Sequence, residues 1–136
     1  MNLFLLDKND PVRIYELPNS DRISITINDS FEEIVVKTIL GENIGKIKFI
    51  VFLDYETYSK LAWMFLDGCK GIYLHRGIGR TALQFYKDYS GYKIYAEDND
   101  GIEKDDGSHL TGDGAYFVYK MRCEGIIEKS RYYDLN

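Results

Sequence analysis

The sequence predicts an α+β fold, with a mixed, mostly antiparallel sheet flanked by helices. Three observations support this prediction. Short alternating runs fill the first half of the chain, a glycine-rich loop at residues 77–79 opens a helical pattern, and another strand-like run follows that helix. The 136 residues are 45% hydrophobic and contain no evident repeat or linker. We therefore expect one domain over residues 1–136.

The first part of the chain predicts short strands separated by turns. Residues 12–15 are typical of a strand, and residues 18–21 contain the proline, asparagine and aspartate of a turn. Residues 22–28 alternate most clearly between apolar and polar side chains. Three isoleucines share the apolar face of this run: Ile23, Ile25 and Ile27.

Residues 30–40 permit two interpretations. Ser30 and Glu33 have the spacing of a helix capping box, which favours a helix. Residues 34–39 are rich in β-branched side chains, which favour a strand. Because residues 41–45 resemble a hairpin connection and residues 46–53 form another apolar run, we favour two antiparallel strands.

The second half of the chain alternates between the two kinds of element. Residues 61–66 form an apolar run that fits a strand or part of a helix beginning near Tyr55. If the run is a strand, the meander leads directly into the glycine loop. The remaining expectations are a helix from Ile78 to a stop at residues 90–91, a strand at 92–96, a long polar loop at 97–114, a helix at 115–124 and a last strand within 126–133.

Composition excludes several classes of function. The formal charge of −5 argues against binding a nucleic-acid backbone and suits a cationic partner. No apolar run is long enough for a membrane span, and the N-terminus lacks the features of a signal peptide, so we expect a cytoplasmic protein. Two cysteines without a CxxC motif or clustered histidines predict no zinc or other metal site.

The glycine loop is the strongest candidate for a binding site. Gly77 and Gly79 precede and enter a predicted helix, whose first amides have no partner within the helix. These amides, the positive end of the helix dipole and the flanking Arg76 and Arg80 suit an anionic group such as a pyrophosphate. An alternative interpretation is that the glycines serve only the strand-to-helix turn.

The order of elements and the loop resemble the GNAT superfamily of acyl-CoA-dependent N-acetyltransferases. The loop of that family reads Arg/Gln-x-x-Gly-x-Gly/Ala; residues 74–79 match both glycines, and Leu74 replaces the first residue. The resemblance spans residues 34–95 and implies an acyl-CoA N-acyltransferase-like fold with a shortened N-terminal half. It also implies acetyl-CoA as cosubstrate, with pyrophosphate on the loop amides and pantetheine along residues 63–67. The implied coenzyme-binding residues are Phe65, Leu66, Leu74, His75, Arg76, Gly77, Ile78, Gly79, Arg80 and Thr81.

The same resemblance implies transfer of an acetyl group to a primary amine, on a small molecule or a protein lysine. The position that often holds the tyrosine acid of the family is Met121 here, which cannot donate a proton, so Tyr119 is the nearest candidate acid. Candidate bases are Asp67 and His109, the latter matched to neutral pH, with the carboxylates Glu97 and Asp98 as further candidates.

Two other classes of function are compatible with the sequence. A non-catalytic binding protein of the inhibitor or immunity type would fit the acidic, tyrosine-rich composition and the missing tyrosine acid. A dinucleotide-binding enzyme would require a longer glycine fingerprint in a parallel βαβ unit. Both a monomer and a homodimer agree with the sequence.

Overall fold

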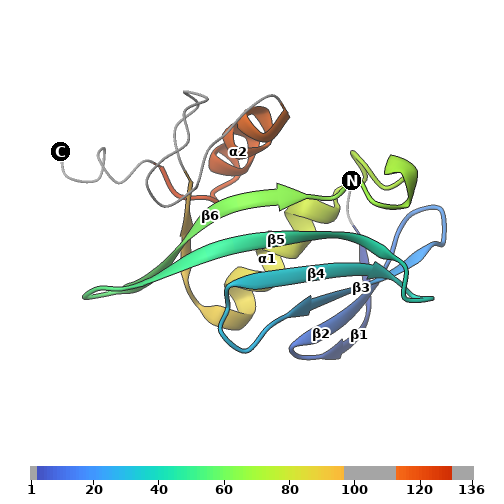
Figure 1. The fold of residues 1–136 in the computed structure, drawn as a ribbon, viewed down its shortest axis with the longest axis horizontal. Coiled ribbons are helices and arrows are strands. Elements are labelled where there is room, and N and C mark those ends of the chain that lie inside the picture. Colours follow the sequence, from blue (N-terminus) through green and yellow to red (C-terminus); the bar gives the residue numbers. More distant parts are fainter. Residues whose placement is uncertain (1–2, 97–112, 130–136) are drawn as a thin grey trace.

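A computed structural model of the chain describes residues 3–96 and 113–129, and within them it has an α+β architecture (Figure 1). Seven strands form one open, mostly antiparallel sheet, and two helices accompany it. The strands are β1 (Phe4–Asn9), β2 (Val12–Glu16), β3 (Arg22–Ile27), β4 (Glu33–Thr38), β5 (Asn43–Leu53), β6 (Thr57–Phe65) and β7 (Lys93–Tyr95). A short turn (Cys69–Gly71) precedes the helix α1 (Ile78–Ser90), and α2 (Asp113–Cys123) follows β7 in the chain.

The strands lie in the sheet in their sequence order. Every neighbouring pair from β1 to β6 is antiparallel, whereas β6 and β7 are parallel. Parallel neighbours require a crossover connection, and α1 makes it. The chain therefore combines a six-stranded meander with one βαβ unit.

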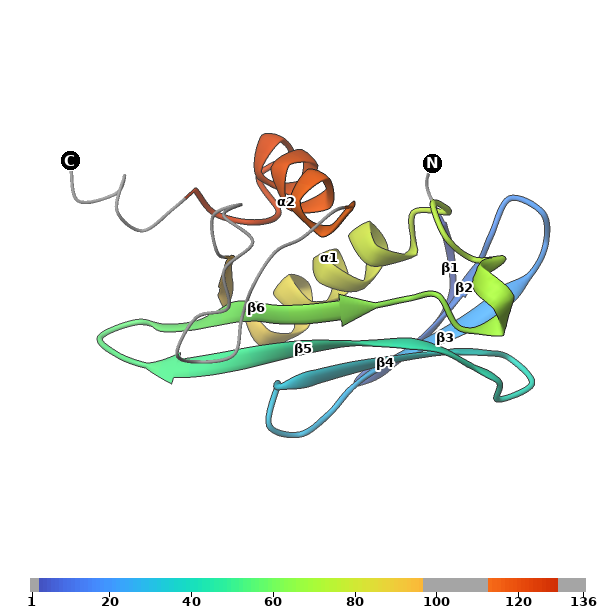
Figure 2. The same cartoon turned by 45° about the horizontal axis from the view of Figure 1, so that its top comes forward.

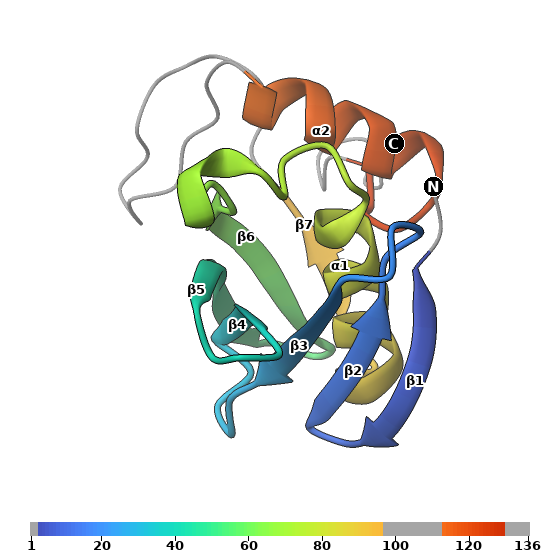
Figure 3. The same ribbon diagram turned by 90° about the vertical axis from the view of Figure 1, so that its right-hand side faces the viewer.

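The core lies between one face of the sheet and α1. Successive side chains of β3 point to opposite faces of the sheet, and its three isoleucines share the buried face. The helix contributes a buried stripe that faces the sheet: Ile78, Ala82, Leu83, Phe85 and Tyr86. Figure 3 shows the twisted sheet curving around α1, and Figure 2 shows α2 on the side of α1 away from the sheet.

Two polar side chains are embedded in this core with partners. The Arg13 guanidinium, on β2, donates to Asp10 at 2.8 Å and lies 4.2 Å from the centroid of the Phe85 ring. This partner holds the pKa of the Asp10 carboxyl below its usual range. The Tyr86 hydroxyl donates to the backbone oxygen of Phe31 at 2.7 Å, and burial raises the pKa of Tyr86 to about 12.

The end of β6 passes very close to the beginning of β5. A Cβ atom at Gly45 would lie 1.8 Å from the backbone oxygen of Phe65 and 2.8 Å from the Cα of Leu66. Only a residue without a side chain fits at this crossing. Gly45 therefore permits the chain to leave β6 toward α1.

Most predicted elements are confirmed. Residues 30–40 contain the strand β4, and the run at 61–66 belongs to a strand that begins earlier, at Thr57. The helix begins at Ile78 and ends at Ser90, with Gly91 in the left-handed conformation of a C-cap. The second helix begins at Asp113, two residues before the predicted start.

Two ends of the chain differ from the predictions or lie outside the described ranges. Residues 4–9, for which the sequence predicted no strand, form the edge strand β1. Residues 126–129 form no strand, although the Glu128 amide donates to the Ile94 oxygen of β7 at 2.7 Å. The predicted loop at 97–112 and the remainder of the predicted last strand are outside the described residues. Within the described ranges, no helix has the length and apolar character to cross a membrane.

Candidate functional site

The candidate site lies where β6 ends and α1 begins, beside an open strand edge. One edge of β6 pairs with β5 from Thr57 to Phe65, whereas the other edge pairs with β7 only at residues 58–60. Residues 61–65 have no second strand beside them within the described structure. The backbone groups along this edge are therefore placed to pair with a bound ligand.

A β-bulge lies in the same stretch of β6. Consecutive residues Lys48 and Phe49 of β5 pair with Trp63 and Leu61 of β6. Ala62 is therefore the extra residue and has no partner in the ladder with β5. Bulges of this kind redirect the backbone and are over-represented next to active sites.

The connection from β6 to α1 is built from left-handed backbone conformations. Five residues have φ between 55° and 82°: Cys69, Lys70, Gly71, His75 and Gly77. Gly77 is the N-cap of α1, and no side chain caps the helix there. The first amides of α1 thus retain the hydrogen-bonding capacity that the sequence predicted for an anion site.

The structure separates the roles of the two arginines near this helix start. Arg80 donates to the Glu124 carboxylate, which follows α2, so its charge is already paired. Arg76 has no ion pair or hydrogen bond with any residue in the described ranges. The prediction that both arginines serve an anion stays a prediction, and among the described residues only Arg80 already has a carboxylate partner.

The two glycines of the loop also have structural roles that need no ligand. Gly77 has φ of 82°, a conformation that other residues adopt only at a cost. A Cβ atom at Gly79 would lie 3.1 Å from two ring carbons of Phe117 on α2 and 3.5 Å from Leu66. Gly79 and Leu66 thus belong to the packing of α2 on α1, which supports the alternative interpretation of the loop glycines.

The other predicted coenzyme-binding residues differ in exposure. Ile78 is a core residue, so only its backbone is placed to meet a ligand. The Thr81 amide donates to the Gly77 oxygen at 3.1 Å and is already satisfied. Phe65, Leu74 and His75 are exposed around the turn.

The predicted catalytic residues do not converge on a described cluster. Tyr119 is 64% exposed on the face of α2 opposite its buried residues, and a hydrogen bond with Cys123 raises the pKa of Tyr119. Met121 is a core residue. Asp67 is exposed in the segment after β6, and His109 lies outside the described residues.

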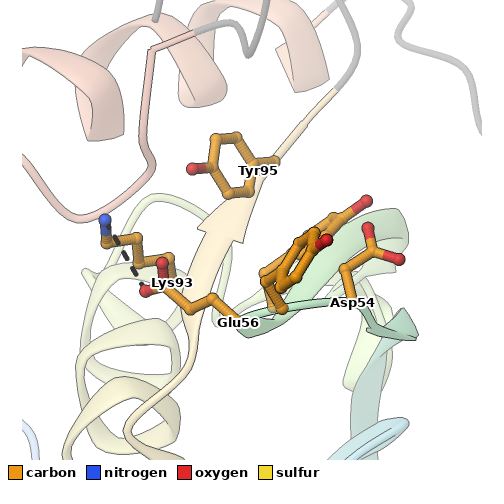
Figure 4. A pocket seen from close by; sticks show the side chains of 6 residues that line it. Asp54, Glu56, Lys93 and Tyr95 are labelled. Atoms are coloured by element: carbon orange, nitrogen blue, oxygen red, sulfur yellow. Dashed lines mark ion pairs between the residues drawn. The ribbon is translucent and has the colours of Figure 1, made fainter.

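A hollow at the opposite end of the sheet was not predicted from the sequence. It occupies about 700 Å³ where β5 turns into β6 and β7 begins (Figure 4). Its lining residues are Asp54, Tyr55, Glu56, Tyr58, Lys93 and Tyr95. The polar and aromatic run at residues 54–58 was the only signal in the sequence, which does not indicate that residues 93–95 lie beside it. Within residues 3–96 and 113–129, no three histidine, cysteine or acidic side chains form a metal-binding group.

Comparison with known proteins gave no relative from which a function can be inferred. No protein-family model, no curated protein and no solved structure matches this chain.

Proposed function

We propose that the protein is an N-acetyltransferase with an acyl-CoA N-acyltransferase-like fold, which transfers the acetyl group of acetyl-CoA to a primary amine. One observation carries this proposal: among the described residues, the bulged edge of β6 beyond residue 60 has no second strand beside it, and the chain continues from there through a turn to the uncapped start of α1. An extended ligand with amide groups and a terminal pyrophosphate fits this combination of backbone edge and helix terminus.

Acetyl-CoA would lie along β6 with its pyrophosphate toward α1. The pantetheine amides would pair with backbone groups of residues 61–65, in the manner of an added strand. The pyrophosphate would accept hydrogen bonds from the first amides of α1, and Arg76 would supply a positive charge. This placement keeps Phe117 packed against Gly79, so the ligand approaches the helix terminus rather than the Gly79 Cα.

The chemistry requires an uncharged amine beside the thioester. The nitrogen attacks the carbonyl carbon, the carbon–sulfur bond breaks, and the amine proton passes to solvent or a base while the thiolate leaves. A backbone amide beside the bulge at Ala62 would stabilise the oxyanion. Since Tyr119 lies on the exposed face of α2, we assign the main rate enhancement to holding the two reactants together.

Calorimetric titration with acetyl-CoA tests the proposal, with NAD as a control ligand. We expect micromolar binding of acetyl-CoA alone, on the order of −8 kcal/mol. Arg76→Glu should weaken binding at least about tenfold, because it places a negative charge beside the pyrophosphate. Lys37→Glu is the matched control, since it makes the same charge change at an exposed position of β4. Failure of the folded protein to bind acetyl-CoA, or equal losses in both variants, would overturn this placement.

A second candidate function, non-catalytic protein binding, is favoured by the edge strand β1. All six residues of β1 are exposed, including three consecutive apolar side chains, Phe4, Leu5 and Leu6. Exposed apolar edges are usually protected in monomeric proteins. If the folded protein binds no acetyl-CoA, this strand becomes the leading candidate surface, because both loop glycines already have structural roles.

A further inference from the structure

We propose that the hollow at the start of β6 is a binding site for an organic cation that carries primary ammonium groups. This site is separate from the proposed coenzyme site. The hollow adjoins the first residues of β6, whereas the proposed coenzyme site lies beyond its last residue, and β6 itself is about 26 Å long.

The walls of the hollow are aromatic and held by packing. The Tyr58 ring stacks on Phe52 with centroids 5.0 Å apart and meets the edge of Tyr95 at 5.4 Å. The faces of tyrosine rings carry negative electrostatic potential and attract cations. A volume of about 700 Å³ is within the range of small-molecule sites, so the hollow can admit a short alkyl chain with its charged ends.

The charges of the hollow select a cation over an anion. Asp54 and Glu56 provide two carboxylates, and Lys93 provides one ammonium, so the lining has a formal net charge of −1. Figure 4 shows Lys93 beside Glu56, with Asp54 on the other side of the hollow and Tyr95 above them. The whole chain has a charge of −5, which further favours the approach of cationic ligands.

A primary ammonium, that of Lys93, already lies beside one of the carboxylates that line the hollow. Its Nζ atom lies 3.7 Å from a carboxylate oxygen of Glu56, and the two side chains are 49% and 68% exposed. An ion pair this long and this exposed contributes little to stability. A ligand ammonium can therefore replace Lys93 beside Glu56 at little cost.

The remaining lining residue, Tyr55, supports a binding role. Its side chain is fully exposed at the turn between β5 and β6, so burial in the core does not explain an aromatic residue there. From this position the ring can close over a cation in the hollow without disturbing the core. Aromatic rings around an ammonium group are an established mode of cation recognition.

Titration with 1,5-diaminopentane, followed by NMR at constant ionic strength, tests the proposal. We expect saturable shifts confined to residues 54–58 and 93–95. The neutral isostere 1,5-pentanediol should cause none, and tetramethylammonium, which cannot donate hydrogen bonds to the carboxylates, should bind more weakly. Nα-acetyl-lysine amide distinguishes a lysine side chain from a free diamine as the source of the ammonium, and saturable binding of either probe supports the site. Absence of saturable binding, or equal binding of the diol, would overturn the proposal.

Three variants separate this site from general charge attraction. Asp54→Asn combined with Glu56→Gln should weaken diamine binding up to about tenfold. Asp21→Asn combined with Glu42→Gln removes the same charge from turns at the opposite end of the sheet and should change affinity less than about twofold. Lys93→Gln should strengthen binding, because it removes the tethered competitor. Equal losses in the two double variants, or weaker binding in Lys93→Gln, would contradict the proposal. No acyl-CoA is present in these titrations, so their outcome is independent of the proposed transferase activity.

Discussion

Two regions of the molecule contribute strands to the same sheet but pair their backbones differently. The first consists of β2, β3 and β4, and the second consists of β6, α1 and β7. β3 pairs with each of its two neighbours through five of its six residues and without any register shift. Within the described structure, β6 has a partner along one side, three paired residues on the other side, and a bulge. The first region is a regular platform that buries apolar side chains. In the second, the described residues leave one edge of β6 without a partner strand near a helix terminus, and this is where we propose that a ligand binds.

The largest effect is expected at Gly45, where the beginning of β5 passes close to the end of β6. Gly45→Ala places a Cβ atom against the Phe65 oxygen, so the end of β6 must move or its pairing with β5 must break. We expect the free energy of unfolding to fall by about 3 kcal/mol or more, measured by urea denaturation. Gly114→Ala is the control, because a Cβ atom at that position would meet nothing within 4 Å and alanine favours the helix. Similar stability of the two variants would show that the crossing is not tight.

An intermediate effect is expected where α2 meets α1. Gly79→Ala brings its Cβ atom against the Phe117 ring and should lower stability by about 1–2 kcal/mol. Phe117→Leu makes room, so the double variant should lose less than the sum of the single losses. Strict additivity would contradict this packing role.

The same pair of variants sharpens the account of the coenzyme site. If the only role of Gly79 is to leave room for the Phe117 ring, the double variant Gly79→Ala, Phe117→Leu should bind acetyl-CoA with wild-type affinity. A loss of affinity in the folded double variant would indicate that Gly79 contacts the ligand directly, as the resemblance of the loop implies.

The smallest effect is expected in the regular region, at the Asp10–Arg13 pair. Asp10→Asn removes a charged partner from the buried guanidinium and should cost about 0.5–1 kcal/mol at pH 7, since Asp88 lies 3.9 Å away on α1 and retains part of the interaction.

The pH dependence of this loss follows from the pKa of Asp10. The folded protein holds this pKa below its usual value, so the carboxylate contributes stability above about pH 4 and loses it as pH falls through the folded pKa. The difference in stability between wild type and Asp10→Asn should therefore shrink as pH falls below about 4 and through the lowered pKa of Asp10. Urea midpoints measured at about pH 7 and at a series of acidic pH values follow this decrease; a constant difference would contradict the role of ionised Asp10.

Local patterns were sufficient for much of the fold. The alternation in β3 and the helical spacing from Ile78, with a glycine stop at Gly91, are confirmed as predicted. Residues 30–40 contain a strand, as their β-branched side chains predict, and not the helix that the capping box favours. Pairing with β3 and β5 stabilises the extended backbone there. The edge strand β1 was missed, since its exposed residues have no alternation to reveal it.

The candidate sites depend more strongly on tertiary structure. The glycine motif identified the start of α1, but only packing shows that Gly79 meets Phe117 and that Arg80 pairs with Glu124. That no described strand pairs with residues 61–65 on their second side likewise depends on where β7 stops pairing.

By itself, the sequence determined the elements whose pattern is local, namely the meander, the glycine turn and the helix that follows. Only the tertiary structure decided which of their edges and ends meet. The hollow shows this most directly, because Lys93 pairs with Glu56 from a distant part of the chain. The physical reason is that periodicity records which face of an element is buried, whereas a site forms from separate elements whose contacts depend on sheet order and register.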